Sequence, residues 1–368
     1  MKKIIIAATA ALLVALSVQT VFAEDTGYDL SGVYQSLSDD AARQMYEMGV
    51  DSADASALSS LGFEDVMSRI AGMAAENSGG PLSGLVTITA LMLVCSMLSA
   101  YKNTLSGDVS ETLNTVCALC VSGAVALPAS QMISSAGGVV VCCANLFLAY
   151  IPIVTAMIAT SGSPLSSASY YAAAIAAGEG AARASADVLV PFLNMLLGLG
   201  VTAGVSPHIR LDGLISMLSR ALKWCMGLMM TVFTAVLSFR QLLSGSLDSV
   251  GGRLARFALG SFVPIVGSAL SEAYGTVQGS ISTLKSGLGV FVIIAVAVTF
   301  LPLVLQTFLW SLTIWTGRAA AQVMGLTQTA GLLESLGAVF SALLAVLLCM
   351  AAVFIICTAA AFSAGGAS

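Results

Sequence analysis

Six acidic residues within or beside long apolar segments are the first groups to consider for chemistry in this chain. A charged carboxylate is costly inside a bilayer, so such a residue often marks an ion path, a substrate site or a buried ion pair. Most of the six fall at the ends of apolar segments, where water can reach them. They are Glu179, Asp187, Asp212, Asp248, Glu272 and Glu334.

Three charged residues share a spacing of four in the stretch 170–187. Glu179, Arg183 and Asp187 therefore lie on one face of a helix, and Arg183 can pair with either carboxylate. Because these charges interrupt an apolar stretch, we expect an interfacial helix or one buried in the bundle. Counted as an extra span, it would reverse the sidedness of every later loop.

Catalytic motifs are absent from the sequence. The sole histidine, His208, follows Pro207, and there is no HExxH zinc motif, no GxSG or GxGD protease motif and no Walker A lysine. Ser163, Ser246 and Ser261 follow glycines, but a serine nucleophile needs a base within hydrogen-bond reach, and none of the three lies in a GxSG motif. We therefore expect no enzyme activity, no catalytic residues, no cofactor and no metal.

The eight cysteines lie in or beside apolar segments rather than in a secreted framework. Cys117 and Cys120 form a CxxC, but there is no second pair to complete a zinc site. We interpret the cysteines as small apolar residues without disulfides.

The elements that carry these residues belong to a membrane protein. Of 368 residues, 58% are hydrophobic and 9% charged, with a mean hydropathy of +0.96, whereas soluble domains have about 25% charged residues. No basic run or basic-aromatic interleaving occurs, so nucleic acid is excluded as a direct ligand. The fold class predicted is an all-α, polytopic helical membrane protein.

The N-terminus has the three parts of a signal peptide, predicted over residues 1–23. Lys2 and Lys3 precede an apolar run, and Val21, Phe22 and Ala23 form a small-residue cleavage site. The alternative is an uncleaved signal anchor. Residues 24–80 follow with eleven acidic residues against two arginines. We expect this acidic region to be extracytoplasmic and helical, resting on the membrane or on a partner.

Residues 81–368 are predicted to form the transmembrane bundle. We expect about seven spans, within a range of six to eight, because each needs about 20 apolar residues. With an extracytoplasmic start, an odd number places the C-terminus in the cytoplasm. The predicted spans are 82–100, 113–133, 139–160, 188–205, 222–239, 287–309 and 336–361.

A segment near 256–272 is predicted to be a broken or re-entrant helix. Its apolar part is short for a span, and Pro264 removes a backbone donor in the middle. Gly260 and Gly267 allow close backbone approach, while Arg256 and Glu272 mark the two ends. The alternative is an ordinary kinked or interfacial helix.

With this segment, 253–273, and the surroundings of Gln306, Thr307 and Phe308, the chain resembles the stage III sporulation protein AE family. The resemblance implies a non-enzymatic multi-pass subunit of the channel or secretion-like complex between mother cell and forespore. It implies a place in the mother-cell membrane around the forespore. It also implies partners: other stage III sporulation membrane proteins, a secretion-type ATPase and ring proteins of the intermembrane space. The alternatives are a stand-alone small-solute transporter and, with less support, an intramembrane hydrolase.

Overall fold

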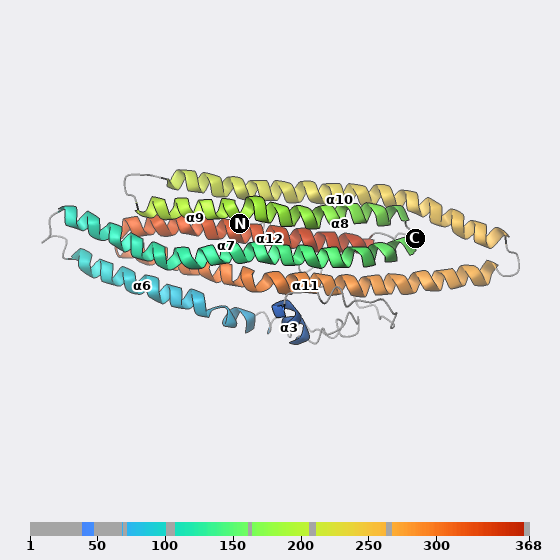
Figure 1. The fold of residues 1–368 in the computed structure, drawn as a ribbon, viewed down its shortest axis with the longest axis horizontal. Coiled ribbons are helices and arrows are strands. Elements are labelled where there is room, and N and C mark those ends of the chain that lie inside the picture. The colour runs from blue at the N-terminus through green and yellow to red at the C-terminus, as the bar shows by residue number, and fades with distance from the viewer. Residues whose placement is uncertain are drawn as a thin grey trace.

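The computed structural model describes residues 39–47, 68, 72–100, 107–160, 164–205, 211–262 and 267–363, and these form a bundle of long helices (Figure 1). No strand occurs among these residues. The elements are α3 (Asp39–Glu47), α6 (Gly79–Ala100), α7 (Gly107–Thr160), α8 (Pro164–Ala184), the π-helical turn η2 (Ser185–Leu189), α9 (Val190–Val205), α10 (Asp212–Phe262), α11 (Gly267–Val323) and α12 (Thr327–Ser363).

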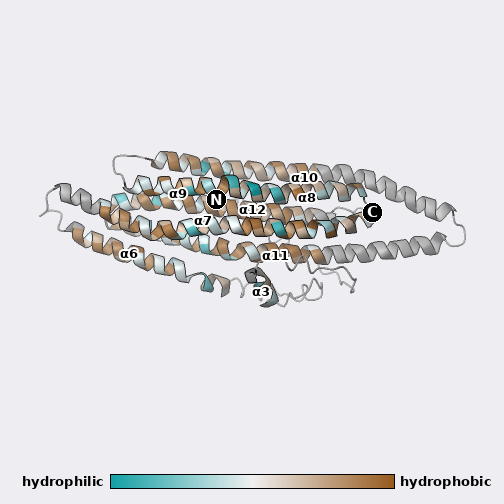
Figure 2. Cartoon of the chain, in the orientation of Figure 1, coloured by the Kyte–Doolittle hydropathy of each residue, from teal (hydrophilic) through white to brown (hydrophobic). Residues whose placement is uncertain are grey.

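Six stretches of the described helices are long and apolar enough to cross a membrane, which confirms a polytopic helical protein within the predicted range. Hydrophobic residues run along the coloured parts of the helices, with polar residues interspersed (Figure 2). The stretches are Gly79–Leu98, Thr115–Thr160, Pro164–Gly204, Gly213–Phe239, Leu288–Val323 and Thr327–Ala360.

Two of the predicted boundaries between spans are wrong. The expected spans 113–133 and 139–160 are one helix, α7, which continues through Gly137 and Gly138. The boundary expected before span 188–205 is also absent, because α8, η2 and α9 follow one another without a break. Of the two expectations for 170–186, a helix in the bundle agrees with the contacts that α8 makes with α7, α10 and α12. In water, a glycine pair often ends a helix, because water can form hydrogen bonds with the freed backbone groups. In an apolar environment these groups have no such partner, so the helix continues and bonds them internally.

The number of spans changes the expected topology. Successive helices run in opposite directions, so six crossings bring the end of α12 to the same side as the start of α6. Figure 1 agrees, because the C-terminal ends of α6, α9 and α11 lie toward the same end of the bundle. Six crossings would put the C-terminus on the side of residues 24–80, whereas the odd number expected from the sequence would put it on the opposite side, and the sidedness stays a prediction.

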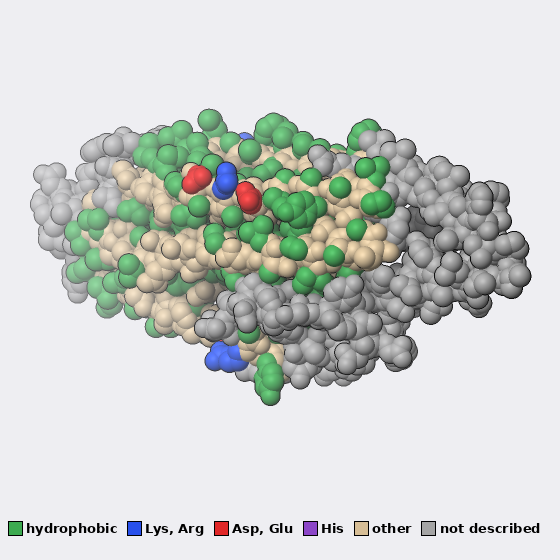
Figure 3. Space-filling view, turned by 45° about the vertical axis from the view of Figure 1, so that its right-hand side comes forward, with side chains coloured by type: hydrophobic (Ala, Val, Ile, Leu, Met, Phe, Trp, Pro, Cys, Tyr) green, Lys and Arg blue, Asp and Glu red, His purple; other side chains and the backbone are tan. Residues whose placement is uncertain are grey.

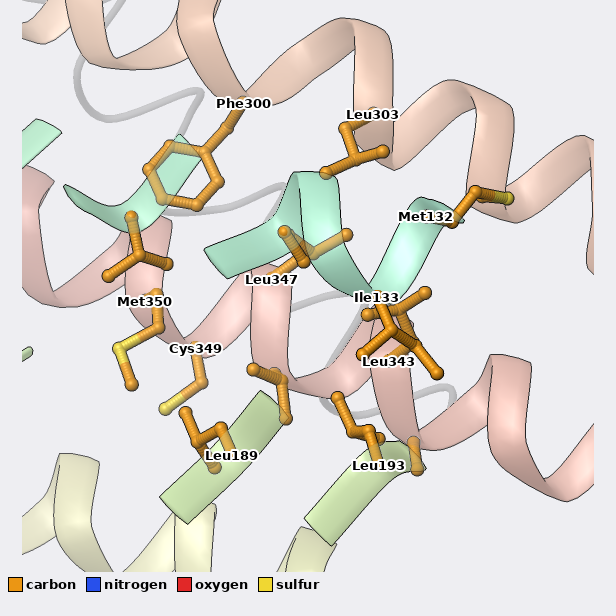
Figure 4. Close-up of a cluster of buried hydrophobic side chains, with 14 of the residues drawn as sticks. Met132, Ile133, Leu189, Leu193, Phe300, Leu303, Leu343, Leu347, Cys349 and Met350 are labelled. Atoms are coloured by element: carbon orange, nitrogen blue, oxygen red, sulfur yellow. The ribbon is translucent and has the colours of Figure 1, made fainter. Parts of the chain in front are cut away.

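α12 lies at the centre of the bundle, against α7, α8, α9, α10 and α11. Its side chains fill the core, as Leu343, Leu347 and Met350 do in Figure 4. Phe354 of α12 packs against Phe147 of α7, with ring centroids 4.9 Å apart. The turn between α11 and α12 is made at Gly325, whose φ of +73° suits a residue without Cβ.

The described part of the acidic region lies on the chain's own bundle. α3 contacts α11, and its Met45 is buried in the core although the helix is polar on average. The predicted signal peptide and most of residues 24–71 lie outside the described residues. Their boundaries and their extracytoplasmic position stay predictions.

Candidate functional site

An ion pair lies on the outer surface of the bundle, near the middle of the 41-residue apolar stretch Pro164–Gly204. Arg183 Nη2 donates to Glu179 Oε2 over 3.2 Å, and the two side chains are 77% and 49% exposed. Asp187 is also exposed. Figure 3 shows two acidic side chains flanking a basic one on a face of hydrophobic and small residues. We call Glu179, Arg183 and Asp187 the charged trio.

The helix changes its geometry at the charged trio. Residues Ser185–Leu189 form a π-helical turn, in which the Val190 N–H donates to the Ser185 carbonyl. Pro191 explains the wide turn, because its ring lacks an N–H and would collide with the carbonyl of Asp187 in a regular α-helix. Such π-turns occur frequently at functional sites. The sequence therefore holds Asp187 within a distorted turn between two regular helices.

A stripe of small and polar residues on α7 runs beside the charged trio. Its members are exposed. The contacts of α7 with α8 and η2 show which residues of these elements lie at the same height along the bundle axis. A Cβ on Gly178 would lie 3.8 Å from the Ala144 carbonyl oxygen, and one on Gly137 would lie 2.9 Å from Val190 Cγ2. We call this stripe the α7 polar stripe: Gln131, Ser134, Ser135, Gly138 and Asn145.

A second polar contact joins α10 to the central helix. Lys223 Nζ donates to Ser341 Oγ over 2.7 Å, and Ser219 Oγ donates to the Ala338 carbonyl over 3.2 Å. Arg318 of α11 and Glu334 of α12 pair over 2.9 Å near the turn between these helices. Glu334 is thus a structural partner rather than an isolated carboxylate.

The hydroxyls of Tyr150 and Tyr170 are buried where α7 meets α8 and lie near each other. Neither makes a hydrogen bond with the described residues. Buried polar groups of this kind are where an ordered water is commonly held.

Four of the six apolar stretches among the described helices are about twice as long as one bilayer requires, with 46, 41, 36 and 34 residues. Thr115–Thr160 has 46 residues and Leu288–Val323 has 36, which correspond to about 70 Å and 54 Å against a hydrocarbon core of about 30 Å. A bilayer around the middle of the bundle would surround the charged trio with lipid. A bilayer around either half would leave apolar surface of the other half outside. Either way, part of the outer surface needs protein cover.

The predicted 256–272 segment lies where α10 ends and α11 begins. Arg256 and Gly260 are in α10, Gly267 and Glu272 are in α11, and Pro264 lies outside the described residues. α10 and α11 extend past the other helices here, as a hairpin at one end of the bundle (Figure 1). The structure does not bring this segment to the charged trio, and its relation to a membrane stays a prediction.

Other sequence candidates add no chemistry among the described residues. No group of three or more His, Cys, Asp or Glu side chains is placed to hold a metal there. His208 and Ser163 lie outside the described residues, and nothing is described of the side chains of Ser246 and Ser261. All eight cysteines are free. The sequence analysis did not predict the contact of Lys223 with Ser341. The one indication in the sequence is a lysine placed one helical turn after Ser219 in an apolar helix.

Comparison with known proteins identifies relatives of this chain. A family model described as "Stage III sporulation protein AE" matches residues 55–365. A protein of that name from Bacillus subtilis (strain 168) is 22% identical over 146 residues, which is 40% of this chain and 37% of the relative. The match thus spans little more than a third of that relative's length. No solved structure matches this chain.

Proposed function

This chain belongs to the stage III sporulation protein AE family, and we propose that it is a non-enzymatic, multi-pass subunit of a channel or secretion-like complex between mother cell and forespore. The family is one of sporulation proteins, and six apolar helices indicate a multi-pass membrane protein. In this proposal the chain lies in the mother-cell membrane around the forespore. Residues 24–80 then face the space between the two membranes.

The observation that carries the proposal is the outer surface of the bundle. Several apolar stretches on this surface are much longer than one bilayer is thick. The exposed charged trio lies near the middle of one of them, Pro164–Gly204. An isolated transporter has only lipid and water to cover its surface, and neither suits both parts of this one. A subunit of a larger assembly has other proteins to cover it.

The partners proposed are those that the family resemblance implies: a secretion-type ATPase, other stage III sporulation membrane proteins and ring proteins of the intermembrane space. The hairpin of α10 and α11 is the element proposed to dock inside the complex, since its helices extend past the bundle. Gly260 and Gly267 would allow a close helix contact there.

Copurification from sporulating cells tests the proposal. The chromosomal gene is given a C-terminal tag, membranes are crosslinked during engulfment, and partners are identified by mass spectrometry. We expect the ATPase and ring proteins to copurify, and deletion of the gene to abolish late forespore gene expression. A deletion strain that sporulates normally, or a tagged chain that purifies without any sporulation protein, would contradict the proposal and favour a stand-alone transporter.

A further inference from the structure

We propose that a second copy of this chain packs on the face formed by α7 and α8–α9, about a twofold axis parallel to the bundle. Two copies in one membrane have the same orientation, so a twofold axis between them must run along the membrane normal. Rotation about such an axis leaves the height of each residue along the bundle unchanged. A residue therefore meets residues of the other copy that lie at the same height. This inference goes beyond the proposed function, which names only other sporulation proteins as partners.

The levels of the two polar elements match. Gly178 lies against Ala144, which puts Glu179 at the level of Asn145 on α7. Gly137 lies against Ser185 and Val190, which puts Asp187 near the level of Gly138 and of the serines one turn away. Glu179 is therefore level with a hydrogen-bond donor of the α7 polar stripe, the Asn145 amide, and Asp187 lies about one helical turn from the serine hydroxyls of that stripe.

A twofold axis would bring these groups together across the contact. With α8–α9 of one copy packed on α7 of the other, Glu179 faces an Asn145 amide, and Asp187 comes within about one helical turn of the Ser134 and Ser135 hydroxyls. Hydrogen bonds to a charged acceptor are stronger than those between neutral groups. The arrangement is self-complementary, because each copy gives both the acceptors and the donors.

The face also has room for close approach. Gly138 and Gly180 are exposed, and a Cβ on either glycine would meet nothing within 4 Å. Small residues let helices of different subunits approach closely in a membrane. On this face they lie beside the charged trio, so close packing and polar pairing would act at the same place.

Photocrosslinking tests which protein covers this face. A photoreactive phenylalanine analogue replaces Val141, an exposed residue of α7 at the level between Glu179 and Asp187. The control replaces Val86, which is 69% exposed on α6. The full chain is expressed in a bacterium without sporulation genes. We expect a crosslinked product of twice the chain mass at position 141 and none at position 86.

Glycine variants test whether close approach is required. Gly138→Leu and Gly180→Leu place a side chain in open space, so the fold is preserved while the contact is blocked. Gly227→Leu is the matched control, since Gly227 is exposed on α10 with nothing within 4 Å of its Cβ. We expect at least a tenfold weaker self-association for the first two, by subunit counting in lipid vesicles, and no change for the control.

Three outcomes would overturn the proposal. The wild-type chain could be monomeric in vesicles at every protein-to-lipid ratio tested. Both α7 and α8 variants could associate as well as Gly227→Leu, with helical content and thermal unfolding confirming that all are folded. In sporulating cells, position 141 could crosslink only to a protein of another mass, which would assign the face to a different partner.

Discussion

Lys223 of α10 donates a 2.7 Å hydrogen bond to Ser341 of α12 within the apolar bundle. One turn earlier, Ser219 donates to the Ala338 carbonyl, so two polar contacts hold α10 against the central helix. Apolar side chains alone slide past one another at little cost. Two hydrogen bonds one turn apart fix both the rotation and the height of α10, and through it the position of α8 beside it.

Ser341→Ala is expected to lower the free energy of unfolding by about 1–3 kcal/mol, because the half-buried ammonium of Lys223 loses this acceptor. Lys223→Met should cost less, since it removes the charge together with its need for a partner. The measurement is thermal unfolding in detergent, followed by reaction of buried cysteines with a thiol dye. Ser216→Ala is the control, because that hydroxyl bonds only within its own helix turn at the surface. A larger loss for Ser216→Ala than for Ser341→Ala would contradict the assignment.

Gly84→Ala is expected to destabilise the packing of α6 on α11. A Cβ at position 84 would lie 2.5 Å from Cη2 and 2.9 Å from Cζ3 of Trp310, whose ring is buried. Overpacking of this kind costs about 1–3 kcal/mol. Gly80→Ala is the control on the same helix, with nothing within 4 Å. Trp310→Leu should cost less in the Gly84→Ala background than in the wild type, and simple additivity of the two changes would count against the contact.

The fold class was predictable because composition and segment length are read directly from the sequence, but the helix boundaries were not. Gly137 and Gly138 look like a break in the sequence, yet α7 passes through them because its neighbours and its environment demand full backbone bonding. The charged trio was recognisable from its spacing of four. The residues that lie beside the charged trio were not predictable, because the contact of Gly178 with Ala144 depends on how two long helices align.

The cysteines are expected to fall into two classes of reactivity, with no disulfide. Cys120 and Cys225 are exposed, whereas Cys117, Cys143, Cys349 and Cys357 are buried. In mild detergent without reductant, the first two should react with a small, membrane-permeant maleimide sooner than the buried four, which should react fully only after denaturation. Mass spectrometry of the modified protein gives the sites. A reductant-dependent gain of labelled cysteines in the denatured chain would show a disulfide and refute the prediction.

Arg183→Gln is expected to change the stability of the isolated chain by less than about 1 kcal/mol, because an ion pair between exposed side chains is worth little. In an assembly that covers this face, the same change leaves the Glu179 carboxylate without its partner. Self-association in lipid vesicles should then fall severalfold, while Arg183→Lys retains most of it. Equal self-association of wild type and Arg183→Gln would mean that the charged trio is not covered by the second copy.

The last prediction concerns the direction in which the chain leaves the bundle. Six crossings place residues 24–78, the turn 161–163 and the C-terminus on one side, and the connections 101–106 and 206–210 on the other. Paired reporters, one active only outside the cytoplasm and one only inside, are fused after positions 78, 103, 208 and 368. We expect positions 78 and 368 to give one pattern, and 103 and 208 the opposite one. The test compares fusion positions within the same chain, so it does not depend on which side of the membrane the N-terminal region occupies. Opposite patterns at 78 and 368 would require an odd number of crossings, which the six apolar stretches of the described helices do not give, and would contradict this prediction.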